Sequence, residues 1–348
     1  MVSISIAMTT CNGALFLRGQ LESLAAQTRL PLELQVGDDC SSDRTLEILE
    51  DFRRKAPFPV VVHRNFPKLG ITENFLATAG RCAGDWIAFC DQDDVWLPQK
   101  LARCARGIER GPSDLKLVAH NATIVFEGES RRYLKTFWRG ADYRPRLGLP
   151  PHWSCAGFTQ VFRRDLLTIL PDPAARALRQ EGVRDGHDYW IPTLAAATGS
   201  ILLLGAPLAL YRRHGNNVTP AVEQEPRSRS RKIWRALRAN GQAYSDEADV
   251  ASRIAALLDE ASAVADKESR ALLADAATRL RSFSGANLKR SLIYADRYRH
   301  RRIGMLKDLL LEGAYRRSPA PSFGPRAFLK DLAYALFLPV GRGPPPSG

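Results

Sequence analysis

Three carboxylates follow an apolar segment near residue 90. Asp91, Asp93 and Asp94 come directly after Asp85–Cys90, whose composition is typical of a buried strand. In an extended chain the side chains at positions 91 and 93 point to the same side. Carboxylates so placed suit a hard divalent cation such as Mg²⁺ or Mn²⁺, which typically bridges to substrate phosphates. The alternative is a helix N-cap, in which Asp93 or Asp94 caps a helix entered at Pro98.

A second acidic pair, Asp38 and Asp39, follows the apolar segment Leu32–Val36. In open parallel sheets, ligands bind outside the carboxyl ends of the strands, so two acidic clusters at such ends would face one crevice. This repetition favours a binding site over simple capping. A cap of the following helix stays the alternative for Asp38 and Asp39.

The segments that must position these acids alternate between strands and helices. Strands are predicted at Ser3–Met8, Leu32–Val36, Pro59–His63 and Asp85–Cys90. Helices are predicted at Ala14–Gln27, from Ser42 to about Lys55, and at Glu73–Ala83. Residues 115–222 are mixed, with strands at Leu117–Phe126, Gly157–Phe162, Ile201–Leu204 and Leu208–Tyr211 and a helix at Asp188–Ala197. Strands separated by helices of this length indicate βαβ units and a mostly parallel sheet, hence an α/β protein.

Several common sites are absent from the sequence. No GxGxxG follows the first strand and no GxxxxGK[ST] occurs, which argues against dinucleotide dehydrogenases and P-loop NTPases. The six cysteines form no CxxC pair, so neither a zinc knuckle nor a redox motif is indicated, and we expect reduced, mostly buried thiols.

Positive charge is concentrated in the last third of the chain. The 348 residues carry a net charge of +13. Residues 1–222 hold 27 basic and 23 acidic side chains, whereas residues 223–348 hold 23 and 14. Such an excess suggests an acidic partner, namely anionic lipid, nucleic acid or a phosphorylated substrate, or else a solvated basic helix face.

The composition divides the chain into four parts. We expect an α/β domain at 1–222, a linker at 223–231, a basic helical region at 232–316 and a Pro-rich tail at 317–348. We expect the tail to be loosely ordered, and it holds one short amphipathic segment, Phe328–Leu338. No apolar stretch approaches the roughly 20 residues that span a bilayer, and the N-terminus does not resemble a signal peptide, so we expect a cytoplasmic protein.

Taken in order, the motifs resemble those of the family 2 glycosyltransferases with the GT-A fold. The matching segments are Ser3–Gly13, where Cys11 replaces a tyrosine of the family; Val36–Thr45, its Asp-Asp-x-Ser-x-Asp-x-Thr motif; Asn65, Gly70, Asn74 and Phe75; Phe89–Leu101, its DxD segment; and Tyr211–Val218, a Tyr-Arg-x-His-x-x-Asn ending. The resemblance covers roughly residues 1–222 and is strongest to the branch that holds rhamnosyltransferases of surface polysaccharide assembly. It implies a Rossmann-like nucleotide-diphospho-sugar transferase fold, with a mostly parallel central sheet flanked by helices, followed here by a C-terminal helical appendage.

The resemblance also implies which residues bind the donor. The nucleotide-binding residues would be Thr10, Cys11, Asn12, Asp38, Asp39, Asn65, Gly70 and Asp91. Asp39 would accept the N3–H of the base, which suits uracil or thymine and rejects cytosine. A divalent metal, Mg²⁺ or Mn²⁺, would be held by Asp91, Asp93 and His214, with Asp93 as the direct ligand, and Arg212 and Arg213 would contact the diphosphate. A surface turn histidine is the alternative reading of His214.

The catalytic base of the resembled family lies at the start of a later helix. Here the run Arg184–Trp190 stands at that position, and we choose Asp188 as the general base. His187 is an alternative base because histidine titrates near neutrality; otherwise it is an exposed histidine at a helix start. Asp185 is a weaker alternative. The acceptor would contact Trp153, Gly157 and Trp190, with the glycine allowing a sugar to approach the backbone.

The implied activity is metal-dependent, inverting transfer of a sugar from a nucleoside-diphosphate donor, dTDP-rhamnose or a UDP-sugar. The acceptor would be a hydroxyl of a polysaccharide or a lipid-linked oligosaccharide. The basic C-terminal third and Phe328–Leu338 would then place the protein peripherally on the anionic inner face of the cell membrane. The alternatives are a non-catalytic sugar-nucleotide-binding or scaffold protein with a degenerate site, and a nucleic-acid binder, for which no recognised signature exists.

Overall fold

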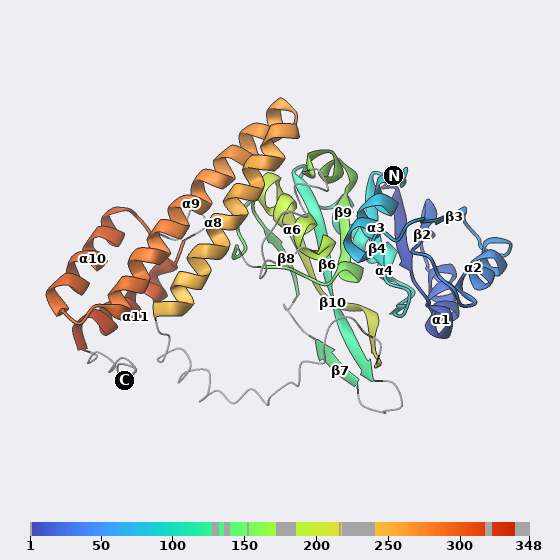
Figure 1. The fold of residues 1–348 in the computed structure, drawn as a ribbon, viewed down its shortest axis with the longest axis horizontal. Helices are drawn as coiled ribbons and strands as arrows, with labels where there is room; N and C mark the ends of the chain where they lie inside the picture. The colour runs from blue at the N-terminus through green and yellow to red at the C-terminus, as the bar shows by residue number, and fades with distance from the viewer. Residues whose placement is uncertain are drawn as a thin grey trace. The chain divides into compact units, whose positions relative to one another are not determined.

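The chain forms two compact units, seen in a computed structural model (Figure 1). The structure describes residues 2–126, 132–135, 140–151, 153–171, 186–215, 217, 241–316 and 322–337. One unit comprises residues 1–148, 153–221 and 261–270, and the other comprises residues 149–152, 222–260 and 271–348. The predicted linker at 223–231 and residues 232–240 lie outside the described residues.

Four parallel strands form the N-terminal half of the sheet. In spatial order they are β3 (Val60–Arg64), β2 (Glu33–Asp38), β1 (Ile4–Thr10) and β4 (Trp86–Cys90). The helices between them are α1 (Ala14–Ala25), α2 (Thr45–Arg53) and α3 (Ile71–Gly80). The predicted βαβ pattern is therefore confirmed. The helix expected from Ser42 begins three residues later, since the Asp43 carboxylate accepts the Thr45 N–H and occupies the turn before it.

Antiparallel and parallel pairs are mixed in the other half of the sheet. Strand β9 (Gln160–Arg163) lies between β4 and β6 (Leu115–Phe126) and is antiparallel to both. Strand β10 (Ser200–Arg213) follows, parallel to β6. The short strands β5 (Val95–Trp96) and β8 (Ala141–Arg144) pair antiparallel with β10, and β7 (Arg132–Lys135) pairs antiparallel with β6. The helices of this half are α4 (Lys100–Glu109) and α6 (His187–Thr198).

Two of the predicted strands differ from the structure here. The strand expected from Gly157 begins at Gln160, because Gly157–Thr159 forms a 3₁₀ turn. The two strands expected on either side of residue 206 are a single strand, β10, whose register shifts around Pro207. Proline lacks an N–H for the ladder and is tolerated at such an irregularity.

The core of this unit lies between the sheet and its helices. All five residues of β4 are buried, as expected for a central strand that is covered on both faces. The predicted helical spacing of α1 is confirmed, since Leu17, Leu21 and Leu24 pack into the same core cluster as β1 and β4.

The regular secondary structure in the described part of the second unit is helical. It consists of α8 (Gly241–Val264) and α9 (Lys267–Ala295), except for residues 261–270 of the first unit, together with α10 (Arg299–Leu311) and α11 (Gly324–Phe337). Their common core includes Ile293, Tyr294, Leu306, Leu309 and Ala335. None of the helices in the described ranges is long and apolar enough to cross a membrane.

The predicted loose tail is wrong for residues 324–337. These residues form α11, which packs on the helical core through Phe328, Leu332, Tyr334 and Ala335. Asp331 of α11 is fully buried, and it pairs with Arg290 of α9 at 2.6 Å while accepting hydrogen bonds from two tyrosine hydroxyls. A buried, fully bonded ion pair fixes the docking of α11 and explains why the amphipathic segment is part of the core.

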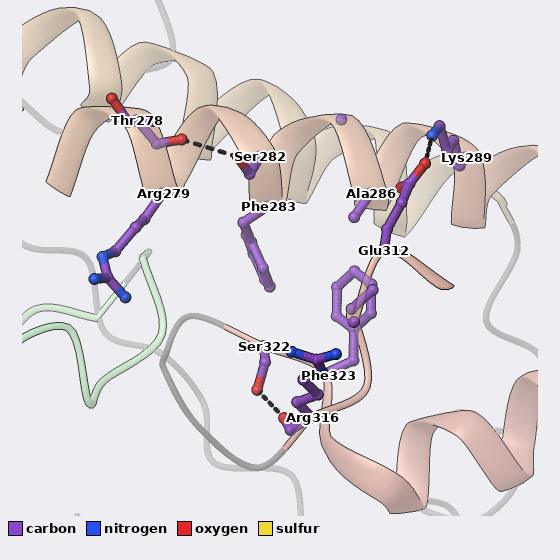
Figure 2. Close-up of a pocket in the computed structure, with 13 residues that line it drawn as sticks. Thr278, Arg279, Ser282, Phe283, Ala286, Lys289, Glu312, Arg316, Ser322 and Phe323 are labelled. Carbon is purple, nitrogen blue, oxygen red and sulfur yellow. Dashed lines mark hydrogen bonds and ion pairs between the residues drawn. The ribbon is translucent and has the colours of Figure 1, made fainter. Parts of the chain in front are cut away.

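A cavity of about 680 Å³ lies beside α9 in this unit (Figure 2). Its apolar lining includes Phe283, Ala286 and Phe323. The carboxylate in its described lining, Glu312, is paired with Lys289. No acid–histidine set lines it within the described ranges, so we sought the chemistry in the sheet-containing unit.

Candidate active site

The carboxyl ends of β1, β2 and β4 lie side by side. Thr10 at the end of β1 is opposite Asp38 at the end of β2, and Met8 is opposite Cys90 at the end of β4. This register brings both acidic clusters to one edge of the sheet, as the sequence predicts.

Asp38 is enclosed by its own turn. Its Oδ2 accepts hydrogen bonds from the Thr10 hydroxyl at 2.9 Å and the Ser41 hydroxyl at 2.5 Å, and its Oδ1 accepts the Ser41 N–H at 3.0 Å. The side chain has no exposed surface. Asp38 therefore ties the ends of β1 and β2 together and positions the neighbouring residues, in place of the direct nucleotide contact that was expected.

The Asp39 carboxylate accepts hydrogen bonds from the segment that follows β3. Its Oδ1 accepts bonds from Asn65 Nδ2 at 3.1 Å and the Leu69 N–H at 2.8 Å, and its Oδ2 accepts the Gly70 N–H at 3.0 Å. Burial alone would raise the pKa of Asp39, but these hydrogen bonds and the charge of Lys68 outweigh it and hold the pKa below its usual value. Each carboxylate oxygen can accept two bonds, so Oδ2 keeps room for one further donor.

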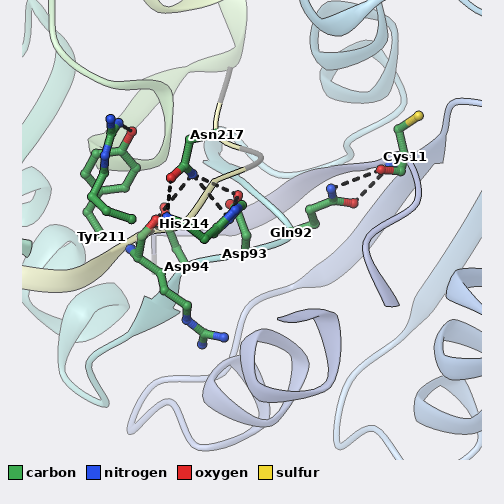
Figure 3. A network of polar contacts seen from close by, with 9 residues as sticks. Cys11, Gln92, Asp93, Asp94, Tyr211, His214 and Asn217 are labelled. Carbon is green, nitrogen blue, oxygen red and sulfur yellow. Dashed lines mark hydrogen bonds and ion pairs between the residues drawn. The ribbon is translucent and has the colours of Figure 1, made fainter. Parts of the chain in front are cut away.

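Gln92 joins the segment after β4 to the turn after β1. Gln92 Oε1 accepts the Cys11 N–H at 2.9 Å, and Gln92 Nε2 donates to the Cys11 carbonyl at 3.1 Å (Figure 3). Asn12, at a φ of 49°, donates its N–H to the Ser41 hydroxyl and accepts the Ser42 N–H. The turn after β1 is thus held through backbone atoms and the Asn12 amide, which leaves the Cys11 thiol outside this network.

His214, at the end of β10, meets the acidic run after β4. Its Nε2 lies 2.9 Å from Asp93 Oδ2, and Asn217 Nδ2 lies 3.4 Å from the same oxygen (Figure 3). The Asn217 Oδ1 accepts the His214 N–H at 2.7 Å, which orients the turn. Two of the three predicted metal ligands, 121 residues apart, are therefore in direct contact.

The third predicted ligand stands apart. In the portion of the chain that is described, no three Asp, Glu, His or Cys side chains converge on a point that could hold a metal, so Asp91, Asp93 and His214 do not form a three-residue set. Burial, followed by the negative charges of Asp93 and Asp188, raises the pKa of Asp91 to about 7. Asp91 therefore lies where several acids crowd together and Lys100 offsets their charge only in part.

Asp94 and Lys100 lie buried beneath this acidic run. Asp94 accepts the Arg212 N–H at 3.2 Å through Oδ1, while its Oδ2 is buried without a hydrogen-bond partner. Lys100 Nζ donates to the Phe158 carbonyl at 2.7 Å, and burial lowers its pKa to about 7. The helix that follows begins at Lys100 with no side-chain cap, so the capping alternative for Asp93 and Asp94 is wrong.

Phe16 supports His214 from α1. The two rings stack with centroids 4.3 Å apart, and the Arg212 guanidinium lies 5.0 Å from the Phe16 ring centroid. Arg213 instead donates to the Tyr211 hydroxyl at 2.8 Å. Of the two predicted diphosphate contacts, Arg212 is the one tied to the Asp94 and His214 side of the site.

His187 is enclosed by aromatic rings. It stacks on Phe75 with centroids 3.9 Å apart, meets Phe89 edge-on at 4.9 Å, and is only 7% exposed. Burial lowers its pKa to about 3, so it is neutral at physiological pH and a weak base. Both earlier readings of His187, a base titrating near neutrality and an exposed helix-start residue, are therefore wrong.

Asp188 begins α6 beside this aromatic cluster. It lies in the first helical turn, half-buried, where the helix dipole favours a negative charge. Its charge contributes to the raised pKa of Asp91, which places the two carboxylates in one electrostatic environment. Asp185, the weaker alternative base, lies outside the described residues.

Comparison with known proteins agrees with this geometry. Residues 5–170 match the sequence model of the family described as Glycosyl transferase family 2. The dTDP-rhamnosyl transferase RfbG of Shigella flexneri is 32% identical over 230 residues, which are 60% of this chain and 72% of that protein. The chain is a family 2 glycosyltransferase.

Other relatives of this glycosyltransferase agree with the assignment. The abequosyltransferase RfbV of Salmonella typhimurium is 32% identical over 101 residues, 28% of this chain and 30% of that protein. The crystal structure of S. aureus TarS 1-349 in complex with UDP-GlcNAc superposes with a TM-score of 0.52 at 17% identity, covering 96% of this chain and 89% of that one. The expected GT-A fold with C-terminal helices is confirmed.

Two of the acceptor contacts expected for this glycosyltransferase are core residues. Trp190 is 1% exposed and cannot present its ring to a sugar. A Cβ at Gly157 would lie 2.4 Å from His187 Nε2, so the glycine makes room for the histidine ring, in place of the sugar that was expected. Trp153 is half-buried and keeps some exposed surface.

Sequence reasoning missed two residues that organise this glycosyltransferase. Gln92 was visible between Asp91 and Asp93, but its partner Cys11, in the turn after β1, lies 81 positions away. Phe16 was read only as part of a helix, because its contact with His214 depends on β10.

Proposed function

We propose that this glycosyltransferase transfers a sugar, with inversion, from a nucleoside-diphosphate donor to a glycan hydroxyl in a metal-dependent reaction. The contact between Asp93 and His214 carries the proposal, because it joins the segments after β4 and β10 at an edge where Lys100 offsets the crowded negative charge only in part. Asp188 adds to the same negative field from α6.

The residues present fit a divalent cation. A carboxylate oxygen and an imidazole nitrogen are both ligands that Mn²⁺ accepts, and Mg²⁺ is commonly held by one or two carboxylates together with substrate phosphates. The buried Asp94 oxygen without a partner and the raised pKa of Asp91 indicate that this region favours additional positive charge. When bound, the cation would neutralise the charge that develops on the leaving diphosphate. Asp93 and His214 would hold it.

The turn after β1 and the free position on Asp39 would bind the nucleoside. Asp39 Oδ2 has room for one more donor, which the N3–H of uracil or thymine supplies and cytosine lacks. We therefore favour dTDP-rhamnose, then UDP-sugars, as donors. The name of the Shigella relative supports the first choice.

Phe66 would supply the aromatic surface that Cys11 does not. It is 95% exposed and lies next to Asn65, which bonds Asp39. The same segment reaches Cys11, since Lys68 Nζ lies 3.6 Å from its Sγ. A ring on this segment can stack on a nucleobase bound by Asp39.

Asp188 would act as the general base. It would take the proton from the acceptor hydroxyl as that oxygen attacks the anomeric carbon, and a single displacement inverts the configuration. Asp188 lies in the first turn of α6, where the helix dipole favours a negative charge. The acceptor would be a polysaccharide or a lipid-linked oligosaccharide, with Trp153 contributing a partly exposed ring.

The test combines nucleotide binding with turnover of the full chain. We expect dTDP or UDP with Mn²⁺ to raise the melting temperature, CDP to have little effect, and EDTA to remove the shift. Asp188→Asn should keep the shift and lose transfer about 1,000-fold, whereas Asp93→Ala should lose both. Full activity of Asp188→Asn would refute the base, and a nucleotide shift without turnover of any donor would favour the non-catalytic alternative.

A further inference from the structure

The outward face of α10 is unusually apolar for a solvent-facing helix. Its inward side chains, Leu306 and Leu309, pack in the helical core. Its exposed side chains include Ile303, Leu310 and Leu311, which are 41%, 45% and 74% exposed. Positions 303, 310 and 311 are separated by seven and eight residues, so they share one side of the helix.

Cations surround these aliphatic side chains. Arg299 and Lys307 are exposed and fall on the same side of α10 as Ile303, at spacings of four residues. α10 carries four Lys or Arg residues and one carboxylate, Asp308. We refer to Arg299, Ile303, Lys307, Leu310 and Leu311 as the α10 face.

The residues just before α10 also combine a large exposed side chain with cations. Tyr298 is 40% exposed, and the guanidinium groups of Arg297 and Arg301 lie 4.8 and 4.9 Å from its ring centroid. The six residues from Arg297 to Arg302 contain no acid. Tyrosine flanked by arginine is a combination that suits the boundary between water and lipid headgroups.

We propose that the α10 face docks the helical unit on an anionic membrane surface. Exposed aliphatic side chains would enter the headgroup boundary, while the long arginine and lysine side chains reach the lipid phosphates. With 13 residues α10 is about 20 Å long, enough to lie along the surface and too short to cross the bilayer. The proposal does not depend on the proposed activity.

Two other occupants fit the α10 face less well. The core of a protein–protein interface is depleted of charged side chains, whereas here the cations alternate with the aliphatic residues. A nucleic acid would use the cations but would leave three aliphatic side chains without a partner. The segment Phe328–Leu338, which the sequence had suggested for this role, packs on the other helices through the buried Asp331 and Ala335 and the partly buried Leu332, so it offers less apolar surface than the α10 face.

Vesicle sedimentation of the full chain tests the proposal. We expect it to bind vesicles of phosphatidylcholine with 30% phosphatidylglycerol, and not vesicles of phosphatidylcholine alone. Arg299→Glu/Lys307→Glu, which reverses both cations of the α10 face, should weaken binding about 30-fold or more, because each basic side chain near the surface contributes about 1 kcal/mol. The matched control is Arg103→Glu/Arg106→Glu, the same charge change at exposed positions of α4, which should bind like the parent.

A second variant tests the apolar component. Ile303→Ser/Leu310→Ser keeps every charge and should weaken binding about tenfold, and Tyr298→Trp should show a blue shift of its fluorescence on anionic vesicles. Binding by Arg299→Glu/Lys307→Glu equal to the parent overturns the proposal. So does self-association of the parent that Ile303→Ser/Leu310→Ser abolishes with no effect of vesicles, or binding to a random oligonucleotide but not to vesicles.

Discussion

At the end of β2, Asp38 and Asp39 accept three hydrogen bonds each, while at the end of β4 one oxygen of Asp94 is buried without a partner and Asp91 has a pKa raised to about 7. Both acidic clusters follow a buried strand of the same sheet and look alike in the sequence. The first uses its charge to build turns, whereas the second crowds several acids together with Lys100 offsetting their charge only in part. This difference separates the part of the site that provides shape from the part that is suited to bind a cation.

The largest effect should follow from removing Asp93. Asp93→Ala deletes the carboxylate that contacts His214, so transfer should fall by about 1,000-fold or more, and the Mn²⁺-dependent shift with dTDP or UDP should disappear. Steady-state turnover and thermal shift measure the two effects. Folding should be unaffected, because the substitution removes one of several crowded negative charges. Activity within tenfold of the parent would contradict the proposed metal site.

Asp38 should behave in the opposite way. Asp38→Ala leaves the Thr10 and Ser41 donors without their acceptor inside the protein, so the free energy of unfolding should fall by about 2–4 kcal/mol. Urea titration of this variant beside Asp93→Ala gives the direct comparison. Equal stability of the two variants would mean that the two clusters do not differ as described.

The raised pKa of Asp91 should be visible in the pH dependence of the free energy of unfolding. Its pKa rises from an ordinary 3.8 to about 7 on folding, so between these values the folded state holds the extra proton and this group's contribution to stability falls as pH rises. His187 has the opposite sign, because its lowered pKa makes stability fall as pH drops below about 6.5. The difference in the free energy of unfolding between the parent and Asp91→Asn, measured in EDTA from pH 4 to 8, isolates the contribution of Asp91. A flat difference curve would refute the charge imbalance.

A smaller effect is expected at Phe66. Phe66→Ala should weaken binding of dTDP or UDP about fivefold, which corresponds to about 1 kcal/mol of lost stacking. Leu32→Ala is the matched control. Leu32 is also exposed, but it precedes the amino end of β2, whereas the proposed site lies at the carboxyl ends of the strands. Calorimetric titration of both variants with Mn²⁺ present would decide the point. Equal affinities would remove Phe66 from the nucleoside site.

The smallest effect on catalysis should come from His187. His187→Leu keeps an apolar side chain between Phe75 and Phe89, and Nδ1 has no hydrogen-bond partner to lose, so transfer should stay within about threefold. The pH profile of turnover should keep its shape. A large loss of turnover with a changed profile would restore His187 as the base.

Local patterns predicted the parts of the molecule that depend on local physics. The spacing of Leu17, Leu21 and Leu24 fixed the buried side of α1, and the acids after two buried strands located the ligand-binding edge of the sheet. The pairing of Asp93 with His214 was foreseen only through the family resemblance, since 121 residues separate the two.

The failures share a cause in distant contacts. His187 looked exposed because its burial depends on rings from α3 and β4. The segment that became α11 looked like a loose tail because its charge at Asp331 is neutralised by Arg290 of another helix. A single sequence records the polarity of such residues but not the partner that compensates it.

The glutamine between the two strand ends has a consequence for altering donor preference. Gln92 bonds the main chain of residue 11, through both its N–H and its carbonyl, and does not contact the thiol, which lies 3.6 Å from Lys68 Nζ. We therefore expect the side chain of residue 11 to be replaceable without loss of these two hydrogen bonds, whereas replacing Gln92 removes both. A library that varies residue 11 would explore new sugar nucleotides on an intact scaffold, whereas the same changes at residue 92 would uncouple the two halves of the pocket.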